Sequence, residues 1–374
     1  MRLSLVSVGP PYRGGISDLS ALLYEELTHK HTVQFINYSR QYPGFLFPGK
    51  TEYKRGELAS DFPSSRIIDS INPYTWYRAI REIEAHSSDW VIFRYWNPFF
   101  ALLIRLMSSG LKRSGIKVAV LVDNLIPHEE SFIDSWMAKR VLSHADQVFT
   151  MAESVTKDVL AHKSNCQVKT LYHPLYEIYK SRYTKEEARS ELKLSDKPVI
   201  LFFGLIRPYK GLDVLIKALG IIHNELKDYQ AYILGEAYED EQKYKDLINQ
   251  TGIASNVVYR NEFIPDDELP LYFAACDVLV LPYRTATQSG IIGIAFQMDR
   301  PVIATQVGGL GEYIEDGQTG YLVKSDDPQA LGTAILKFFN GDDKYRMMDN
   351  VKNTKSQFSI ADFCSQLTGV LQDG

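Results

Sequence analysis

Short runs of apolar, β-branched and aromatic residues recur along the chain and alternate with segments of helical periodicity. The runs are nearly continuous in apolar side chains, as strands of a parallel sheet are when both faces of the sheet are covered. They are LSLVSVG, TVQFINY, WVIFRYW, KVAVLVD and QVFTMAE in the first half of the chain, and PVILFFG, QAYILGE, NVVYRNEF, DVLVLPY and PVIAT in the second. Strand and helix alternate twice over, which predicts an α/β protein of two doubly wound domains in tandem.

The boundary between the two domains is predicted between a strand near Lys169 and the strand that begins at Pro198. The segment between them opens with His173-Pro174 and continues as a charged helix, which is typical of a connector. A chain of 374 residues also exceeds the roughly 250–300 residues at which a single core stops growing. Ligands of open parallel sheets bind beyond the carboxyl ends of the strands, so two facing sheets would place a ligand in a central cleft.

Cysteine usage and hydropathy bear on the compartment. Cys166, Cys276 and Cys364 lie far apart and without metal-clamp spacing, which favours a reducing compartment such as the cytoplasm. The apolar run at the N-terminus is too short for a signal peptide, and we expect it to be a first core strand. The most apolar helical stretch, residues 99–107, is far shorter than the roughly 20 residues that span a bilayer.

The net charge of −5 argues against a nucleic-acid-binding protein, because such proteins need a basic surface to neutralise phosphates. The charge is unevenly distributed: residues 1–190 contain 24 Lys and Arg against 20 Asp and Glu, whereas residues 191–374 contain 17 against 26. Either the first half meets an anionic partner or the two domains simply differ in charge.

Three loops that follow predicted strands carry residues suited to bind phosphate. The first, Gly9 to Asp18, has adjacent glycines ahead of a helix, where backbone N–H groups and the helix dipole favour an anion. Its spacing does not match the GxGxxG pattern of dinucleotide-binding proteins, which makes a dehydrogenase a poor candidate. Taken alone, this loop could equally be an ordinary strand-to-helix turn.

The second loop, FFGLIRPYKGLD from Phe202 to Asp213, carries the strongest signal. Arg207 and Lys210 stand together at a strand end beside two glycines, where they could grip a diphosphate. The alternative is a pair of solvated cations. In the third loop, Thr287-Gln288-Ser289-Gly290 precedes an apolar helix and offers a nest of backbone amides, although a helix capped by Ser or Thr would look the same. Together the three loops indicate a diphosphate site.

GPPYRGGIS, FFGLIRPYKG, RPVIAT and the segment from Val307 to Tyr321 resemble family-4-type glycosyltransferases of the GT-B fold in order and spacing. Segments around Arg40 to Lys50, Arg94 to Pro98 and Asp123 to Glu129 resemble a bacterial branch of that family. The resemblance covers nearly the whole chain. It implies two Rossmann-like domains facing a central cleft, with an N-terminal acceptor-side domain over residues 1–175 and a C-terminal donor-binding domain over 190–357. It also implies that a final helix, about 358–374, packs back on the first domain.

The resemblance assigns three residues to catalysis. Arg207 and Lys210 match the pair that holds the diphosphate of the donor and stabilises its departure, which is electrostatic catalysis by preorganised cations. His128 matches an active-site histidine near the transferred sugar; the alternative is a histidine that caps the next helix. Enzymes of this kind retain the anomeric configuration and need neither a metal nor a cofactor, since the nucleoside diphosphate sugar is a substrate.

The same resemblance assigns the contacts with the donor. Gly14 and Gly15 match a loop that closes over the phosphates, and Ile264 matches the segment that lines the nucleobase. Other donor contacts are Thr287, Gln288, Ser289 and Gly290, in addition to Arg207 and Lys210. One departure matters: relatives carry two glutamates around this helix start, one for the sugar and one for the ribose. This chain has Ala286 or Thr287 at the first place and Ile294 or Ala295 at the second, so ribose binding must come from elsewhere.

The acceptor side is predicted around Arg40, Tyr42 and Lys50, which follow the second strand, and around Arg94. Aromatic rings stack on sugars and cations attract phosphate-bearing or lipid-linked acceptors. The alternative is a hinged surface loop with buried aromatics. The helix over residues 99–107, which continues to Lys112-Arg113, could touch a membrane, although a helix that covers the sheet explains it as well.

We therefore predict a cytoplasmic retaining glycosyltransferase that moves a sugar from a nucleoside diphosphate to a saccharide or lipid-linked glycan. Its expected partners are that donor and acceptor and no nucleic acid, and its more basic N-terminal half suits peripheral contact with the inner membrane surface. Two alternatives stay open. One is a non-catalytic sugar-nucleotide-binding protein derived from a transferase, and the other is a different GT-B enzyme such as a nucleotide-sugar epimerase.

Overall fold

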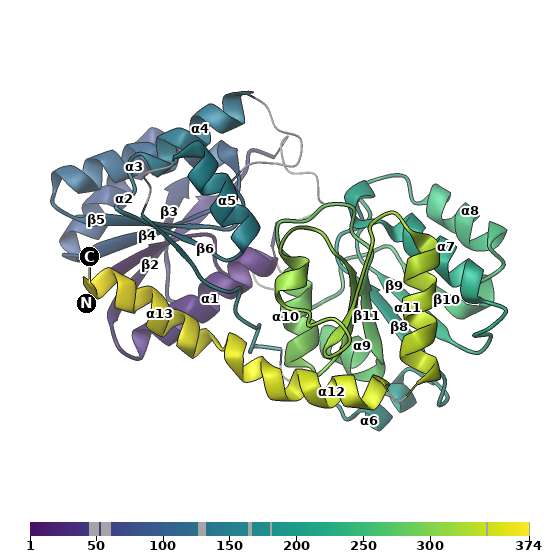
Figure 1. Ribbon diagram of the computed structural model, residues 1–374. Helices are drawn as coiled ribbons and strands as arrows, with labels where there is room; N and C mark the ends of the chain where they lie inside the picture. Colours follow the sequence, from purple (N-terminus) through teal and green to yellow (C-terminus); the bar gives the residue numbers. More distant parts are fainter. Residues whose placement is uncertain are drawn as a thin grey trace. The chain divides into compact units, whose positions relative to one another are not determined.

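The computed structural model describes residues 1–44, 52–53, 61–125, 132–163, 167–179, 182–341 and 343–373, with only the backbone at 132–134. The chain divides into two compact units (Figure 1). Unit 1 consists of Met1–Pro174 and Ser359–Gly374, and unit 2 of Leu175–Phe358. Each unit contains one parallel sheet with helices on both faces, which confirms the predicted class of two doubly wound, Rossmann-like α/β domains.

Unit 1 is built on a seven-stranded parallel sheet of order β3-β2-β1-β4-β5-β6-β7. The central strands β4 and β5 are almost entirely buried, which explains their uninterrupted apolar sequences. The strands are β1 (Arg2–Val6), β2 (Thr32–Arg40), β3 (Ser65–Asp69), β4 (Trp90–Tyr95), β5 (Lys117–Val122), β6 (Gln147–Thr150) and β7 (Val168–Thr170).

Helices cover both faces of this sheet. In Figure 1, α2, α3, α4 and α5 lie along one face and α1 and α13 along the other. Neighbours in the first layer contact one another in the order α2, α3, α4, α5, and α1 contacts α13 in the second. The helices are α1 (Gly15–Thr28), α2 (Pro73–Ala85), α3 (Ala101–Arg113), α4 (Phe132–Leu142), α5 (Glu153–His162) and α13 (Ile360–Asp373), with a 3-10 turn η1 (Pro98–Phe100) ahead of α3.

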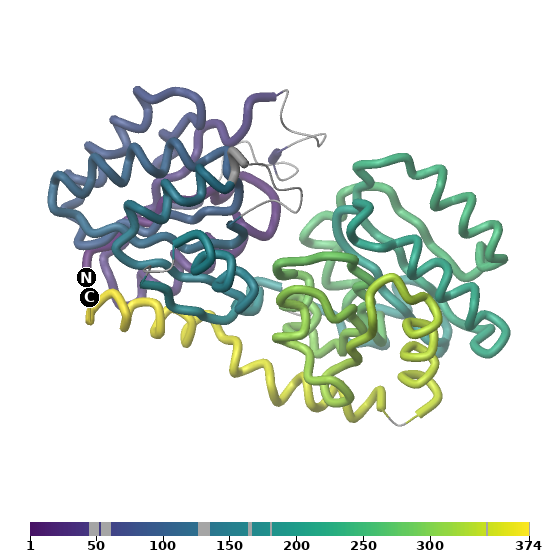
Figure 2. Tube along the Cα trace, turned by 45° about the horizontal axis from the view of Figure 1, so that its top comes forward, coloured from purple at the N-terminus to yellow at the C-terminus, as the bar shows by residue number. Residues whose placement is uncertain are grey.

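The C-terminal helix α13 belongs to unit 1 although its sequence follows unit 2. It packs against α1, and the indole Nε1 of Trp90 donates a 3.0 Å hydrogen bond to the carbonyl of Leu371. The two chain ends consequently lie side by side at unit 1 (Figure 2).

Unit 2 is built on a six-stranded parallel sheet of order β10-β9-β8-β11-β12-β13. Its strands are β8 (Val199–Phe203), β9 (Gln230–Leu234), β10 (Val257–Arg260), β11 (Val278–Leu281), β12 (Val302–Thr305) and β13 (Gly320–Val323). Its helices are α6 (Lys185–Glu191), α7 (Leu212–Ile222), α8 (Gln242–Gln250), α9 (Leu269–Ala275), α10 (Gly290–Gln297), α11 (Pro328–Asn340) and α12 (Asp343–Thr354). Short 3-10 turns are η2 (Pro208–Lys210), η3 (Ala254–Asn256), η4 (Gly308–Glu312) and η5 (Lys355–Phe358).

Every apolar run that the sequence analysis assigned to a strand forms one. The charged helix ahead of Pro198 is α6, which begins with a capping box: Glu187 N donates to Thr184 Oγ1 and Thr184 N donates to Glu187 Oε2. The segment from Leu175 onward, which the sequence analysis treated as a connector, belongs to unit 2.

Candidate functional site

The loops that leave the carboxyl ends of β8 and β9 in unit 2 are joined by backbone hydrogen bonds. Ile206 N donates to Glu236 O at 2.9 Å, and Tyr238 N donates to Ile206 O at 3.1 Å. Beyond the neighbouring strands, Gly309 N donates to Thr287 O at 2.9 Å and links the loops that follow β12 and β11. The strand ends thus present linked loops at the edge where parallel sheets bind ligands.

Two glycines allow these loops to approach one another. Gly211 has a φ of 64°, and a Cβ there would lie 2.0 Å from the carbonyl oxygen of Pro282. Gly308 has a φ of 50°, and its Cβ would lie 1.6 Å from the carbonyl oxygen of Ala286. Both positions therefore need glycine for its conformation and for its lack of a side chain.

Arg207 and Lys210, the predicted diphosphate ligands, both lie in the loop after β8. The guanidinium of Arg207 lies over the ring of Tyr238, 4.8 Å from its centroid, and Lys210 Nζ lies 4.9 Å from the centroid of Tyr283. Across the described part of the chain, neither side chain forms a salt bridge or hydrogen bond. Aromatic faces hold these cations in place while leaving their N–H donors available to an anion.

Arg284, in the loop after β11, supports the loop that carries Arg207 and Lys210 through hydrogen bonds. Its guanidinium donates to both carboxylate oxygens of Asp213 at 2.9 and 2.8 Å and to the carbonyl of Pro208 at 2.8 Å. Its Nε donates to Asp326 at 2.6 Å, and its backbone N–H donates to Tyr209 O at 2.7 Å. Although partial burial acts in the opposite direction, the Arg284 guanidinium holds the pKa of Asp213 below its ordinary value, so this pair stays ionised at neutral pH.

The predicted amide nest lies at the start of α10. Ser289 is the N-cap residue in extended conformation, and its side chain makes no capping hydrogen bond. Thr287, Gln288 and Gly290 are partly exposed in the same turn, so the first amides of the helix can meet an anion. A Cβ at Gly290 would lie 2.6 Å from the hydroxyl oxygen of Tyr176, so any larger residue here would displace that side chain.

The positions to which the resemblance assigns paired glutamates hold no acid in this chain. Ile294 and Ala295 belong to α10 and are buried. Ile264, the predicted nucleobase contact, is also buried, with 3% of its surface exposed, while the preceding Phe263 is half-buried. Only a small part of Ile264 is thus accessible in this structure.

In unit 1, Gly14 ends the loop after β1 and Gly15 is the first residue of α1. Gly14 is the N-cap residue of α1 with a φ of 106°, a conformation that favours glycine. Arg94, predicted to contact the acceptor, lies inside the unit with 1% of its surface exposed. Its guanidinium forms a two-pronged ion pair with Asp123 and donates to Ile16 O at 2.9 Å in the first turn of α1. The structure therefore gives Arg94 a role in fixing the helix that follows the glycine pair.

The other predicted acceptor residues follow β2. The Arg40 guanidinium pairs with the Asp69 carboxylate, with Nε donating at 2.9 Å. Tyr42 accepts a 3.2 Å hydrogen bond from Trp96 Nε1, and its ring packs against Phe99. Tyr42, Trp96 and Phe99 are half-buried and form an aromatic platform beyond β2 and β4. Lys50 and His128 lie outside the described residues.

Sequence reasoning missed the residues that support Arg207 and Lys210. Tyr238, Tyr283 and Arg284 each lie within four residues of the end of β9 or β11, so a search of all strand ends for aromatic and basic residues would have found them. Asp213 lies in the first turn of α7, where an acid is usually assigned to the helix dipole. Its pairing with Arg284 depends on the tertiary fold.

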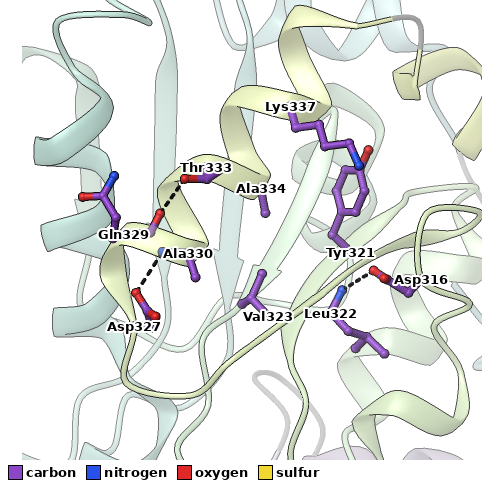
Figure 3. Close-up of a pocket in the computed structure, with 10 residues that line it drawn as sticks. All are labelled: Asp316, Tyr321, Leu322, Val323, Asp327, Gln329, Ala330, Thr333, Ala334 and Lys337. Atoms are coloured by element: carbon purple, nitrogen blue, oxygen red, sulfur yellow. Dashed lines mark hydrogen bonds between the residues drawn. The ribbon is translucent and has the colours of Figure 1, made fainter.

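A pocket of about 480 Å³ lies along the edge strand β13 and helix α11 (Figure 3). Its two carboxylates accept hydrogen bonds from nearby backbone amides. Asp327 Oδ1 accepts from Ala330 N and Asp316 Oδ1 accepts from Leu322 N, each at 2.9 Å. Lys337 covers the ring of Tyr321 at 4.5 Å. Two carboxylates beside a single lysine do not suit a diphosphate.

Within the described ranges, no three His, Cys, Asp or Glu side chains converge as metal ligands. A membrane-crossing helix would need greater length and apolar content than any helix in those ranges has.

Comparison with known proteins places this geometry in context. Residues 197–340 match the family model described as glycosyl transferases group 1. The GDP-mannose-dependent α-(1-6)-phosphatidylinositol monomannoside mannosyltransferase of Mycolicibacterium smegmatis is 26% identical over 342 residues, which cover 87% of this chain and 86% of that protein. A D-inositol 3-phosphate glycosyltransferase of Streptomyces scabiei is 26% identical over 236 residues, which cover 60% of this chain and only 52% of that protein.

Solved structures share the fold over the whole chain. Anabaena HepE in complex with UDP superimposes with a TM-score of 0.78 at 18% identity and full coverage of both chains. Sucrose-phosphate synthase from Thermosynechococcus elongatus gives a TM-score of 0.73 at 18% identity, covering 100% of this chain and 98% of that one. At 18% identity this likeness shows a common fold.

Proposed function

From the premise that this chain is a group 1 glycosyltransferase of the GT-B fold, we propose that it moves a glycosyl group from a nucleoside diphosphate sugar to a saccharide or lipid-linked glycan with retention of configuration. A single observation carries the proposal. Arg207 and Lys210 lie at the carboxyl end of β8, each held by an aromatic ring and neither paired with an acid in the described residues. Two uncompensated cations at a strand end are suited to a dianionic leaving group.

In the proposed reaction, the bond between the anomeric carbon and the leaving phosphate oxygen breaks and the electron pair stays on that oxygen. Arg207, Lys210 and the first amides of α10 stabilise the charge that develops there, with donors already in place before the bond breaks. The acceptor hydroxyl attacks the anomeric carbon from the face that the phosphate leaves, and its proton passes to a phosphate oxygen. The products are the glycoside and the nucleoside diphosphate, and no metal or cofactor is needed.

The remaining roles are proposals that follow from the resemblance. Gly14 and Gly15 contact the phosphates of the donor, Thr287 to Gly290 contribute backbone amides, and His128 lies near the transferred sugar. On the acceptor side, the half-buried Tyr42, Trp96 and Phe99 offer ring faces for a sugar. We place the reaction in the cytoplasm, with the more basic N-terminal half against the inner membrane surface.

One observation favours a second candidate, a sugar-nucleotide-binding protein without turnover. Ile294 and Ala295 are buried apolar residues of α10, so the helix offers no carboxylate to the sugar or the ribose. This candidate predicts tight binding of a nucleotide sugar and no release of nucleoside diphosphate on any acceptor.

The experiment is a donor screen in two steps. Thermal shift with a panel of nucleotide sugars identifies the donor, because a ligand that binds only the folded state raises the apparent stability. Release of nucleoside diphosphate is then measured with and without candidate acceptors, and the anomeric configuration of the product is read by NMR. Acceptor-dependent release supports the transferase, whereas a thermal shift without release on any acceptor supports the binding protein. An inverted product would overturn the proposed stereochemistry.

A further inference from the structure

The two helical layers of unit 1 carry opposite charges. Helices α1 and α13, which cover one face of the sheet, contain five acidic and no basic residues. Of the helices on the other face (Figure 1), α2, α3 and α4 contain seven basic and three acidic residues, and α5 contains one basic and two acidic residues. The modest positive charge of the N-terminal half is thus concentrated on one side of one sheet.

On α2 the outward residues form a single stripe. Tyr74, Tyr77, Arg78 and Arg81 are all exposed and follow the i, i+3, i+4, i+7 spacing of one helix face. The two tyrosines are 68% and 59% exposed. Arg81 pairs with Glu84 at 2.8 Å, whereas Arg78 forms no ion pair with any residue that the structure describes.

The adjacent helix α3 continues the pattern. Leu102 and Leu106 are 52% and 44% exposed and flank Arg105 on the same face. The helix ends in exposed Lys112 and Arg113, of which Lys112 pairs with Asp146 at 2.5 Å. Because α3 contacts both α2 and α4, its stripe lies between theirs.

Helix α4 adds a tryptophan. Trp136 is 48% exposed, and the guanidinium of Arg140 lies 4.0 Å from the centroid of its ring. Lys139 is exposed beside it. Exposed Trp and Tyr next to Arg and Lys are the residues enriched where proteins meet the interface of a bilayer.

The exposed apolar side chains are gathered here rather than scattered. Among the described residues, eleven large apolar side chains are exposed, and six belong to α2, α3 and α4 or to the turn ahead of α2. They are Ile71, Tyr74, Tyr77, Leu102, Leu106 and Trp136. Single exposed apolar residues are ordinary on any protein, whereas such a concentration marks an interaction surface.

We propose that the outer face of α2, α3 and α4, named here the α2–α4 face, docks on an anionic lipid bilayer. Arg78, Arg113 and Lys139 meet the phosphate headgroups, while Trp136, Leu102 and Leu106 enter the interface between headgroups and acyl chains. The acidic α1 and α13 layer then faces away from the membrane, so the charge asymmetry orients unit 1. This inference rests on the proposed function, which includes contact with the inner membrane surface, and it names the face of unit 1 that makes that contact.

Charge complementarity selects this occupant over others. A second copy of the chain would bring an equally basic face, and like charges repel. Nucleic acid would use the cations but gain nothing from exposed leucines. Anionic lipid uses both the cations and the apolar side chains.

The test uses the full chain and sedimentation with two kinds of vesicle, phosphatidylcholine alone and phosphatidylcholine mixed with phosphatidylglycerol. We expect binding to the mixed vesicles that weakens as salt rises, and little binding to phosphatidylcholine. Because each basic residue near an anionic surface changes affinity by about 5-fold, Arg78→Gln with Arg113→Gln should weaken binding by more than 10-fold. Trp136→Ala and the pair Leu102→Gln with Leu106→Gln should also weaken it.

Matched controls come from unit 2. Lys217→Gln removes an exposed cation of α7, and Tyr345→Ala removes an aromatic side chain of α12 that is 70% exposed. Both should bind mixed vesicles as the unchanged chain does, and circular dichroism checks that every variant is folded. Equal binding to both vesicle types, or loss of binding in the controls as large as in the face variants, would overturn the proposal.

Two further readouts keep the outcomes distinct. One contrary outcome is a dimer in sedimentation velocity that the double variant Leu102→Gln with Leu106→Gln dissociates, together with no binding of the unchanged chain to vesicles. In that case the face is an interface between copies and the proposal is wrong. Vesicle binding does not need turnover, so Arg207→Ala should bind normally. Turnover without vesicle binding contradicts this inference alone, and vesicle binding without turnover by the unchanged chain contradicts the proposed transferase alone.

Discussion

Arg284 donates two parallel hydrogen bonds to the carboxylate of Asp213, from Nη1 to Oδ1 at 2.9 Å and from Nη2 to Oδ2 at 2.8 Å. Asp213 belongs to the first turn of α7 and Arg284 to the loop after β11. The pair therefore ties the C-terminal end of the segment that carries Arg207 and Lys210 to the loop after β11. Since the same guanidinium also binds Pro208 O, the position of the two cations depends on this one side chain.

Arg284→Gln should lower kcat by on the order of 10-fold or more with a smaller change in KM for the donor, because a loss of alignment affects the transition state most strongly. The matched control is Arg260→Gln at the end of β10. It removes a similarly exposed guanidinium, which is paired with Glu262 and Glu268. Steady-state kinetics of both variants, with their melting temperatures, separate alignment from stability.

The combination of Arg284→Gln with Arg207→Ala and Lys210→Ala sharpens this test. If Arg284 acts only through those cations, its replacement should have little further effect on kcat once they are gone. An effect of Arg284→Gln as large in that background as in the unchanged chain would show a separate role for Arg284.

Removal of the cations themselves should be more severe. Arg207→Ala or Lys210→Ala is expected to cut kcat by on the order of 100-fold or more, because each supplies preorganised charge to the leaving phosphate. Arg207→Lys keeps the charge but loses the planar fork and should fall between Ala and the unchanged chain. The measurement is acceptor-dependent release of nucleoside diphosphate, and full activity in both Ala variants would contradict their assigned roles.

Asp277 offers a prediction about stability. Its carboxylate is fully buried and pairs with Lys185, with Arg189 at 2.9 Å and with Lys344 at 2.7 Å. Burial works against ionisation, but the lysines hold the pKa of Asp277 below its ordinary value. Asp277→Asn leaves these cations without their partner and should destabilise unit 2 by about 3–5 kcal/mol.

The readout for Asp277→Asn can be confined to one unit. All four tryptophans, at positions 76, 90, 96 and 136, belong to unit 1, so their fluorescence reports on that unit. Urea unfolding followed by circular dichroism should shift to lower concentration, while the tryptophan transition should shift less. Asp326→Asn, at an exposed acid in the pair with Arg284, is the control for stability.

The two doubly wound sheets could be predicted because their central strands are covered on both faces and so read as unbroken apolar runs. Edge strand β3, with the sequence SRIID and one largely buried residue, lacks that pattern and was missed. Edge strand β13, only four residues long, was recognised only as part of a motif. Short edge strands depend on their neighbours rather than on their own sequence.

For the candidate site, the sequence pattern identified the loops at the strand ends but not the side chains that contact Arg207 and Lys210. Arg207 and Lys210 follow a strand, which local pattern reveals. The aromatic rings that contact these cations, and Arg284, lie in the loops after β9 and β11. Only the tertiary fold therefore brings them together with Arg207 and Lys210. Arg94 illustrates the converse, because an arginine at a strand end was expected to face a ligand and is instead buried against Asp123.

His173 makes unit 1 sensitive to acid. Burial, together with the nearby Arg94 guanidinium, lowers the pKa of His173 from its ordinary 6.5 to about 4, and the Pro174 carbonyl that it contacts opposes this only in part. Below pH 6.5 the unfolded chain therefore takes up a proton that the folded chain does not. The free energy of unfolding should decrease as pH falls from 6.5 to 4, by about 3 kcal/mol in total from this group. Above pH 6.5 its contribution is constant.

The measurement is urea unfolding monitored by tryptophan fluorescence at pH 7, 5.5 and 4. The free energy of unfolding should fall less steeply with pH in His173→Gln than in the unchanged chain. The control is His29→Gln, at a histidine whose side chain is 69% exposed, and it should follow the unchanged chain. Parallel curves for His173→Gln and the unchanged chain would show that His173 does not titrate on unfolding.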